Sequence, residues 1–380
     1  MCLDDESPSN AGERHTQFLL NGQAHPFANR WLDKPVQFAV ASNGLSAGIY
    51  DHAKVDGMDV RGLHRHVTHA LFAHPSNSFD SSSSNPTTYP FYEHIWKPTP
   101  SVLERIEQVR DNCKSYGLID HQYVNIDSLG LDFLRDHRVP PKATAHLTVL
   151  VALYLVDAMI RPAWEIVSLA TFARGRLDWI QTVTPPVRAF VEAAAAVAVA
   201  EGDDVISKAQ HAHALLGPAA AAHSSAISTA ARGRGFVNHM YALLGVALSS
   251  SSSTTTTTTT DNNNNNNNNN NKNLPAIFRT RAWDATRRGG PDQDLKIGFM
   301  PTDDDDHNHN HGHNHNLEDV SVRWDEGGFL MHGQRGVYVH CDVREHHASF
   351  AVSARPEYAA AVCEALGRAA GVVVGLLANR

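Results

Sequence analysis

The sequence predicts a mixed α/β protein, and two kinds of pattern carry that prediction. Short runs rich in β-branched and aromatic residues lie near both ends of the chain, which is typical of strands. Between them, apolar residues recur with the spacing of amphipathic helices. The strands are too scattered for a regular alternation of strand and helix, and the sequence has no internal repeat. We therefore expect a mixed sheet flanked by helices.

The first strands are expected in residues 35–50, PVQFAVASNGLSAGIY, where two β-rich runs flank Asn43 and Gly44. An Asn-Gly pair between such runs indicates a hairpin with a type I′ turn, because that turn needs positive φ at both central residues. Residues 101–116 follow Pro-Thr-Pro and predict an amphipathic helix. Its apolar face comprises Val102, Leu103, Ile106 and Val109.

Further helices are expected over residues 142–159, 185–200, 201–216 and 219–248, strands near 337–342 and 348–352, and a closing helix over 356–378. The segment 143–160 is apolar at most positions, but it contains His146 and Asp157. A membrane-spanning helix tolerates charge at its centre poorly. This segment therefore predicts a buried helix, and no membrane span is expected.

Composition argues against some classes of function. The chain has 32 Lys and Arg against 40 Asp and Glu, a net charge of −8, which disfavours a nucleic-acid partner. Its four cysteines lack CxxC spacing, which indicates reduced thiols inside a cell. The first residues, MCLDDESPSN, are acidic and polar, so we expect no secretory signal and a cytoplasmic location.

Three segments of simple composition are expected to be disordered inserts: residues 76–88, 249–273 and 303–316. They carry no apolar periodicity and cannot offset the entropy of ordering a chain. Residues 1–18 are expected to be a disordered N-terminus. The third insert holds five histidines, which could chelate a metal, but a flexible tract lacks the supporting contacts of a built site. No metal site is therefore predicted.

One short segment carries a candidate catalytic pair. In GIYDHAKVDG, His52 and Asp56 are four residues apart, which places them on one face if the chain is helical there. A carboxylate beside an imidazole can orient the ring and support the imidazolium that forms when it takes a proton. The chain has 24 histidines, so spacing alone leaves a plain surface histidine as the alternative.

Longer stretches, in one consistent order, resemble the choline/carnitine acyltransferase family. NRWLDKPVQFAVASNGLSAGIYDHAKVDGMDV is similar to the family's catalytic segment, where Trp and Asp-Lys-Pro precede a hairpin that delivers the catalytic His. Residues 129–141 resemble the CoA-binding segment, 168–184 the Gly-Arg substrate segment, 223–240 the alcohol-selecting helix and 338–355 the last strand pair. The resemblance covers residues 19–380 except the three inserts.

The resemblance implies a CoA-dependent acyltransferase-like mixed sheet flanked by helices, lacking most of the family's N-terminal domain. It implies acyl transfer from a thioester to a small alcohol, with no acyl-enzyme. His52 would be the general base and Asp56 its orienting partner. No cofactor is expected, because acyl-CoA or an acyl-carrier thioester is a co-substrate.

The resemblance also implies where the thioester donor binds. The family's two lysines for the CoA 3′-phosphate align with Leu131 and Arg135, so one of the two charges is missing. Arg138 and Lys142 could restore positive charge nearby, and an Arg suits a phosphate well. The alternative is a solvated basic start of a helix.

At the acceptor site, the family's partners for the carnitine carboxylate align with Trp164, Ile166, Leu177 and Asn238, all apolar or neutral. Burying a carboxylate without a cation is costly, so an alcohol other than carnitine is expected.

Related acyltransferase domains occur at the C-terminus of fungal highly reducing polyketide synthases, where a polyketide moves from a carrier protein to a polyol. That comparison implies a missing N-terminal domain or a larger synthase as a partner of this chain. The alternative is an inactive family-derived fragment with at most a binding or assembly role.

Overall fold

The computed structural model describes residues 2–9, 13, 18, 29–31, 33–51, 54–55, 57–73, 95–113, 120–173, 175, 177–252, 274–280, 283, 295–299 and 337–378. The chain divides into two compact units, Met1–Leu118 with His311–Glu326 and Ile119–Asn310 with Gly327–Arg380. Of the three predicted inserts, residues 76–88, 253–273 and 303–316 lie outside the described residues.

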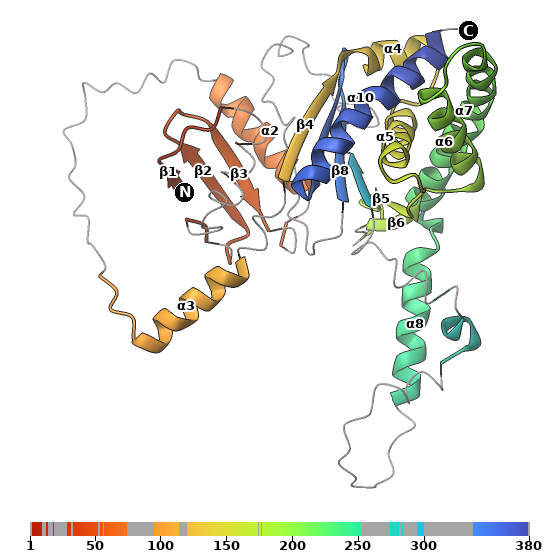
Figure 1. Ribbon diagram of the computed structural model, residues 1–380. Helices are drawn as coiled ribbons and strands as arrows, with labels where there is room; N and C mark the ends of the chain where they lie inside the picture. Colours follow the sequence, from red (N-terminus) through yellow and green to blue (C-terminus); the bar gives the residue numbers. More distant parts are fainter. Residues whose placement is uncertain are drawn as a thin grey trace. The chain divides into compact units, whose positions relative to one another are not determined.

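The first unit contains a three-stranded sheet in the order β1-β2-β3 (Figure 1). Its strands are β1 (Cys2–Asp4), β2 (Val36–Ala41) and β3 (Ser46–Tyr50). β1 runs parallel to β2, and β2 and β3 form an antiparallel hairpin. The prediction of disorder over residues 1–18 is therefore wrong for Cys2–Asp4.

A buried ion pair explains why β1 is ordered. The Arg30 guanidinium donates to both carboxylate oxygens of Asp4, at 2.9 and 2.6 Å, and both side chains are fully buried. Its Nε also donates to the carbonyl of Phe18 at 2.6 Å. Such a two-pronged contact satisfies both buried charges, which a disordered chain end could not do.

The hairpin predicted from Asn43 and Gly44 is confirmed, but the type I′ turn is wrong. The Ala41 N–H donates to the Leu45 carbonyl at 2.8 Å, and the Gly44 N–H donates to the Ala41 carbonyl at 3.0 Å. Asn43 is not among the described residues with positive φ, whereas Gly44 has a φ of 83°. The loop is one residue longer than a type I′ turn and ends in a left-handed glycine.

Two helices, α2 (Gly57–Ala73) and α3 (Pro100–Cys113), follow the hairpin. α3 confirms the helix expected over residues 101–116, although it ends at Cys113. The residues of its predicted apolar face, Val102, Leu103, Ile106 and Val109, are between 39% and 50% exposed. The periodicity therefore predicted the helix correctly, but within the described residues that face is not buried.

The second unit contains a six-stranded mixed sheet in the order β4-β9-β8-β7-β5-β6. Its strands are β4 (Asp120–Ile126), β5 (Ala163–Ser168), β6 (Leu177–Gln181), β7 (Leu295–Phe299), β8 (Val337–Val343) and β9 (Ala348–Ala354). β7 is parallel to β5 and to β8, and the other neighbours are antiparallel. The predicted mixed α/β class and the two predicted C-terminal strands are confirmed.

The helices and short helical turns of this unit are η2 (Asp127–Leu129), α4 (Leu131–Asp136), α5 (Pro141–Asp157), α6 (Pro185–Ala198), α7 (Asp204–Thr229), η3 (Ala230–Arg234), α8 (Val237–Ser252), η5 (Ala276–Arg279) and α10 (Pro356–Ala378). α5 and α10 pack against each other and against the sheet, α5 on β8 and α10 on β4 and β9. α6 and α7 pack on α5 in turn, so the core lies between the sheet and these helices (Figure 1).

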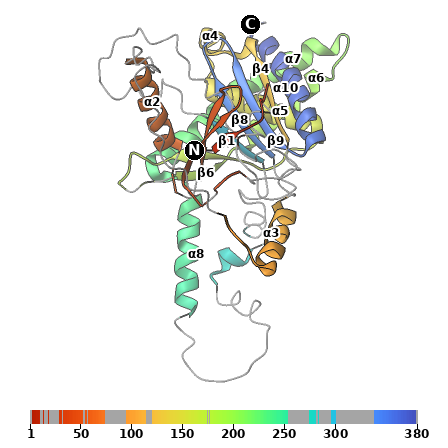
Figure 2. The ribbon, with the colours of Figure 1, turned by 90° about the vertical axis from the view of Figure 1, so that its left-hand side faces the viewer.

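The break between the two helices expected at 201–216 and 219–248 occurs elsewhere. α7 continues through Pro218, because Leu216, Ala219 and Ala220 are buried in the core and hold that turn in place. The helix ends instead at η3, a π-helical turn in which Gly233 has a φ of 71°. α8 then starts in a new direction and extends away from the sheet (Figure 2). It includes Ser249–Ser252 of the predicted second insert, so that part of the disorder prediction is wrong.

Two apolar helices bear on the expectation of no membrane span. α5 contains most of the apolar segment 143–160, and its residues Ala143–Leu153 are all buried, as predicted. α10 is the one described helix that is long and apolar enough to cross a membrane. It buries Val362, Leu366 and Val373 in the same core as α5, so we assign it to the core.

Candidate functional site

The predicted catalytic pair, His52 and Asp56, lies outside the described residues, so its geometry stays a prediction. The residues on either side are ordered. β3 ends at Tyr50, the Asp51 N–H donates to the Pro35 carbonyl at 3.0 Å, and α2 begins at Gly57. Burial raises the pKa of the Tyr50 hydroxyl to about 12, so that group stays protonated at neutral pH.

The predicted donor residues come from α4, from the loop after it and from the start of α5. Backbone bonds fix this segment against the turn between β8 and β9: Leu131 N–H donates to Arg344 at 2.8 Å and Asp132 N–H to Glu345 at 3.1 Å. As a result Arg135 lies 3.7 Å from the Glu345 carboxylate, and both side chains are about half exposed. The positive charge of Arg135 is therefore partly neutralised by Glu345 of the turn between β8 and β9.

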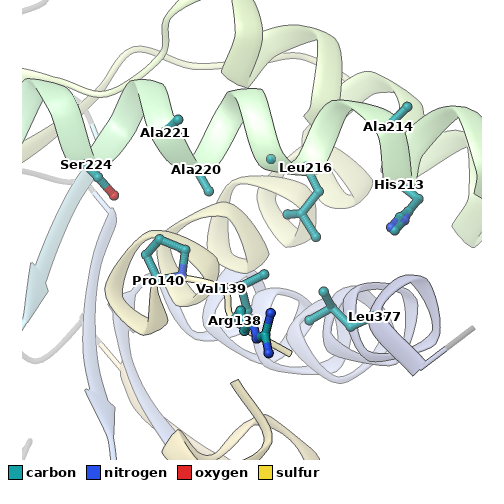
Figure 3. Close-up of a pocket in the computed structure, with 11 residues that line it drawn as sticks. Arg138, Val139, Pro140, His213, Ala214, Leu216, Ala220, Ala221, Ser224 and Leu377 are labelled. Carbon is teal, nitrogen blue, oxygen red and sulfur yellow. The ribbon is translucent and has the colours of Figure 1, made fainter. Parts of the chain in front are cut away.

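Arg138 lies at a bend of the chain and borders a cavity. Its φ is 53°, an unusual backbone conformation for a residue with a side chain, and its N–H donates to the Arg135 carbonyl at 2.9 Å. The cavity, of about 400 Å³, lies between this bend, α7 and α10 (Figure 3). It is lined mainly by aliphatic groups such as Leu216, Ala220 and Leu377, with Arg138 the charged group on its lower side.

The third predicted donor residue, Lys142, points to an acid. Its Nζ lies 2.7 Å from Oε1 of Glu165, and Lys142 is about half exposed whereas Glu165 is buried. Two of the three predicted donor cations are therefore ion-paired within the chain.

The predicted acceptor residues are divided along the ladder between β5 and β6. Trp164 is opposite Gln181, and Leu177 is opposite Ser168, so both lie on the same face of the sheet. Four residues separate their rows, which corresponds to about 13 Å along the strand. Trp164 is buried, so it lines the interior at one end of the ladder while Leu177 lies half-buried at the other.

Asn238 joins Leu177 at that second end. Its Nδ2 donates to the Leu177 carbonyl at 2.7 Å, and its backbone N–H donates to Oδ1 of Asp178 at 3.2 Å. Asp178 is buried and also accepts the Trp179 N–H at 2.8 Å. The structure therefore brings Leu177 and Asn238 together, beside an acidic group.

A buried cluster that the sequence reasoning missed lies on the other face of β5. We define the Glu165 cluster as Lys142, His146, Glu165 and His223. Oε2 of Glu165 accepts from Nε2 of His223 at 2.8 Å and lies 3.2 Å from Nδ1 of His146. The two imidazole rings are tilted against each other at 41°, with 4.4 Å between centroids. The four residues come from three elements, α5, β5 and α7.

The electrostatics of the cluster favour an ionised carboxylate beside neutral histidine. Burial by itself would raise the pKa of Glu165, but contacts with His146 and His223 and the charge of Lys142 outweigh it and hold the pKa below its usual range. Burial lowers the pKa of His146 to about 4, and the neighbouring His223 acts in the same direction. The negative charge of Glu165 is therefore balanced by Lys142.

The ligand atoms of His146, Glu165 and His223 lie within 4.8 Å of one another, a combination that can hold a metal ion. The 2.8 Å separation of His223 from the carboxylate is a hydrogen-bond distance, shorter than the roughly 3.3 Å between ligands around tetrahedral zinc. The Lys142 ammonium already neutralises the carboxylate. The arrangement fits a hydrogen-bonded carboxylate better than a metal centre.

Part of this cluster had a signal in the sequence. His146 interrupts an apolar segment, and a polar group in a buried helix requires a partner. Nothing in the sequence identifies that partner, because Glu165 and His223 are 19 and 77 residues away.

Comparisons with known proteins agree with the resemblance. The family model described as Choline/Carnitine o-acyltransferase matches residues 1–289. Highly reducing polyketide synthase 17 of Metarhizium anisopliae is 50% identical over 99% of this chain and 12% of that protein. Highly reducing polyketide synthase sdnO of Sordaria araneosa is 30% identical over 98% of this chain and 11% of that protein. Carnitine O-acetyltransferase of Mus musculus is 26% identical over 64% of this chain and 38% of that protein. The chain thus spans only a small part of the length of these relatives.

Proposed function

The chain belongs to the choline/carnitine O-acyltransferase family, and from that premise we propose that it moves an acyl group from a thioester to the hydroxyl of an alcohol other than carnitine. Family membership supports acyl transfer in general. The observation that carries the choice of acceptor is the neutral pair of Leu177 and Asn238, with the Asn238 amide donating to the Leu177 carbonyl.

In this proposal His52 is the general base and Asp56 orients its ring. The imidazole takes the proton of the acceptor hydroxyl while the hydroxyl oxygen attacks the thioester carbonyl. Collapse of the tetrahedral adduct breaks the C–S bond, and the departing thiolate takes the proton back from the imidazolium. The net reaction exchanges a thioester and an alcohol for an ester and a thiol.

The acceptor is argued from charge. Carnitine carries a carboxylate, and a buried carboxylate needs a cation or several donors nearby. Here the side-chain amide of Asn238 is already bonded to the Leu177 carbonyl, and its backbone N–H donates to the carboxylate of Asp178. An acid at this position repels a carboxylate and tolerates a hydroxyl or an ammonium. Choline or a neutral polyol fits this environment better than carnitine.

The positive charges of the predicted donor segment favour a carrier-bound thioester over CoA. A CoA 3′-phosphate needs nearby positive charge, whereas Lys142 is paired with the buried Glu165 and Arg135 shares its charge with the exposed Glu345. A phosphopantetheine arm on a carrier protein lacks the CoA nucleotide and makes no such demand. Two relatives are named as polyketide synthases, and the chain covers about a tenth of their length. We therefore infer that it works within a larger synthase on a carrier-bound acyl chain.

The test measures thiol release and ester formation in the full-length protein. Donors are an acyl-CoA and the same acyl group on phosphopantetheine, and acceptors are choline, glycerol and L-carnitine. We expect transfer to choline or glycerol to exceed transfer to carnitine, and His52→Ala to abolish it. His69→Ala is a matched control, because His69 is exposed on α2, close to His52 in the sequence.

Each outcome of this test has a distinct meaning. A higher kcat/KM for L-carnitine in the unmodified protein would exclude the proposed acceptor class. Transfer by His52→Ala at the parent rate would remove His52 from its role. No transfer with any donor or acceptor would favour the alternative of an inactive family member that binds or assembles.

A further inference from the structure

The Glu165 cluster lies on the face of β5 opposite to the predicted acceptor residue Trp164. Side chains alternate between the two faces of a strand, so Glu165 faces opposite to its neighbours Trp164 and Ile166. On its own face Glu165 meets His146 and Lys142 of α5 and His223 of α7. One carboxylate therefore connects β5 to two helices of the core, while the adjacent side chains lie on the acceptor face.

The cluster is specific in its geometry. Oε1 of Glu165 receives the Lys142 ammonium at 2.7 Å, and Oε2 receives His223 at 2.8 Å with His146 at 3.2 Å. A buried carboxylate tolerates few other arrangements, because its charge needs the Lys142 ammonium beside Oε1 and the His223 donor at Oε2. A shift of β5 along the sheet by one residue would break all of these contacts at once.

Lys142 differs from the other donor cations in what it contacts. It comes from the second residue of α5, and its charge balances the one buried acid of the cluster. Withdrawing it to bind a phosphate would leave that acid without a countercharge, which is strongly unfavourable. Its geometry therefore suits a role in holding β5 better than a role on the donor.

We propose that the Glu165 cluster is a positioning device for the acceptor strand, in which Lys142, His146 and His223 hold the Glu165 carboxylate and thereby fix Trp164 and Ile166 on the opposite face for the acceptor alcohol. The inference rests on the proposed function, which makes β5 the acceptor strand. It assigns Lys142 a positioning role that acts through Glu165, in place of a contact with the donor.

The test compares Glu165→Gln with Glu192→Gln in the full-length protein. Glu192 is a matched control, because it forms an exposed ion pair with Arg188 on α6, at 3.7 Å. We expect Glu165→Gln to raise the KM for the acceptor about tenfold. Without the carboxylate, β5 places Trp164 and Ile166 less precisely, and small misplacements of such side chains have large effects. The KM for the thioester donor should change less than about twofold. The single variant Lys142→Arg should keep the parent KM for both substrates, because it preserves the positive charge beside Glu165.

A second measurement does not depend on activity. Hydrogen exchange should become faster in β5, residues 163–168, of Glu165→Gln, while α10 keeps its protection. If Glu165→Gln fails to fold, the charge-balanced double variant Lys142→Met with Glu165→Gln takes its place in both measurements.

The outcomes separate this inference from the proposed function. A rise in donor KM with acceptor KM unchanged would overturn it and return Lys142 to the donor. Unchanged exchange in β5 would overturn it as well, whatever the kinetics. If the unmodified protein transfers no acyl group, the proposed function fails, and exchange alone decides whether the cluster holds β5.

Discussion

Lys142 and Arg135 are two cations of one short segment, and they have different partners in the structure. Arg135 aligns with a donor lysine of the family, and Lys142 was expected to restore the charge that the other lysine would supply. Lys142 meets the buried Glu165 at 2.7 Å, and the Glu165 carboxylate also contacts the buried His146 and His223. Arg135 meets Glu345 at 3.7 Å on the surface, where both partners are about half exposed. An exposed pair is weakened by water and salt, whereas a buried acid cannot exchange its partner for solvent. The burial of the partner, and not the cation itself, decides which residue remains available to a ligand.

The largest effect in this comparison is expected on removing the buried pair's cation. Lys142→Met should destabilise the protein by about 3 kcal/mol, because it leaves a buried carboxylate without its countercharge. Adding Glu165→Gln should recover most of that loss, since the charge that needed compensation is gone. Urea unfolding of the two single variants and the double variant measures this coupling. Additive losses would show that the two side chains do not interact.

Acid should weaken the same cluster. The pKa of His146 falls from its ordinary 6.5 to about 4 in the folded protein, so the unfolded chain binds this proton more readily. The stability is complete above about pH 6.5 and falls toward pH 4 by up to about 3 kcal/mol. Glu165, with its lowered pKa, adds a loss that begins below about pH 4.5.

The groups that face this cluster are Lys142 and His146 on α5, His223 on α7 and the thiol of Cys341 on β8. Urea unfolding between pH 7 and pH 4 checks the prediction, with His146→Gln as the comparison, because this variant removes the buried imidazole. A pH dependence that is identical in the parent and in His146→Gln would assign the acid loss to other groups.

A smaller effect, on the choice of acceptor, is expected when a cation is added at residue 238. Asn238→Arg should shift the kcat/KM ratio toward L-carnitine by about fivefold, the size of one partly exposed ion pair. The gain is limited because Asp178 already lies beside residue 238 and would share the new charge. Competition between choline and L-carnitine measures the ratio, and Asn238→Gln controls for size alone. An equal shift in both variants would show that charge is not what selects the acceptor.

The smallest effect on stability is expected at the exposed pair. Arg135→Gln should leave the melting temperature unchanged, because water replaces the contact with Glu345 on both sides. It should weaken donor binding about threefold at low salt and less at high salt, because the exposed guanidinium can exchange Glu345 for a phosphate of the donor. A clear fall in melting temperature would remove the distinction between the two cations.

Local patterns in the sequence predicted part of the elements, but not strands β4, β5 and β6 of the larger sheet. The hairpin, α3, α5, α6, α10 and the strands β8 and β9 all follow from periodicity and turn residues, since each is specified by neighbours a few residues apart. Two predictions were wrong in detail, at a turn and at a helix break, because nearby residues left more than one local conformation open. The loop at Asn43 and Gly44 has one residue more than a type I′ turn, and the helix break falls at Gly233 and not at Pro218.

Motif order determined the family, because several segments resemble it in one order along the whole chain. It also predicted Leu177 and Asn238 as acceptor residues, and the structure brings these two together. It could not determine what each side chain would meet. Lys142 was expected to supply positive charge at the donor site, yet its carboxylate partner is on a strand 23 residues later.

Only the tertiary structure decided the Glu165 cluster. Its residues come from α5, β5 and α7, and no pattern within any one of these elements points to the other two. Packing removes them from water together, and in that environment each polar atom must find a partner among whichever groups the fold brings near. The sequence alone therefore determined part of the elements and the family, whereas burial, which exists only once the chain is folded, decided which charges are committed to the structure and which face a ligand.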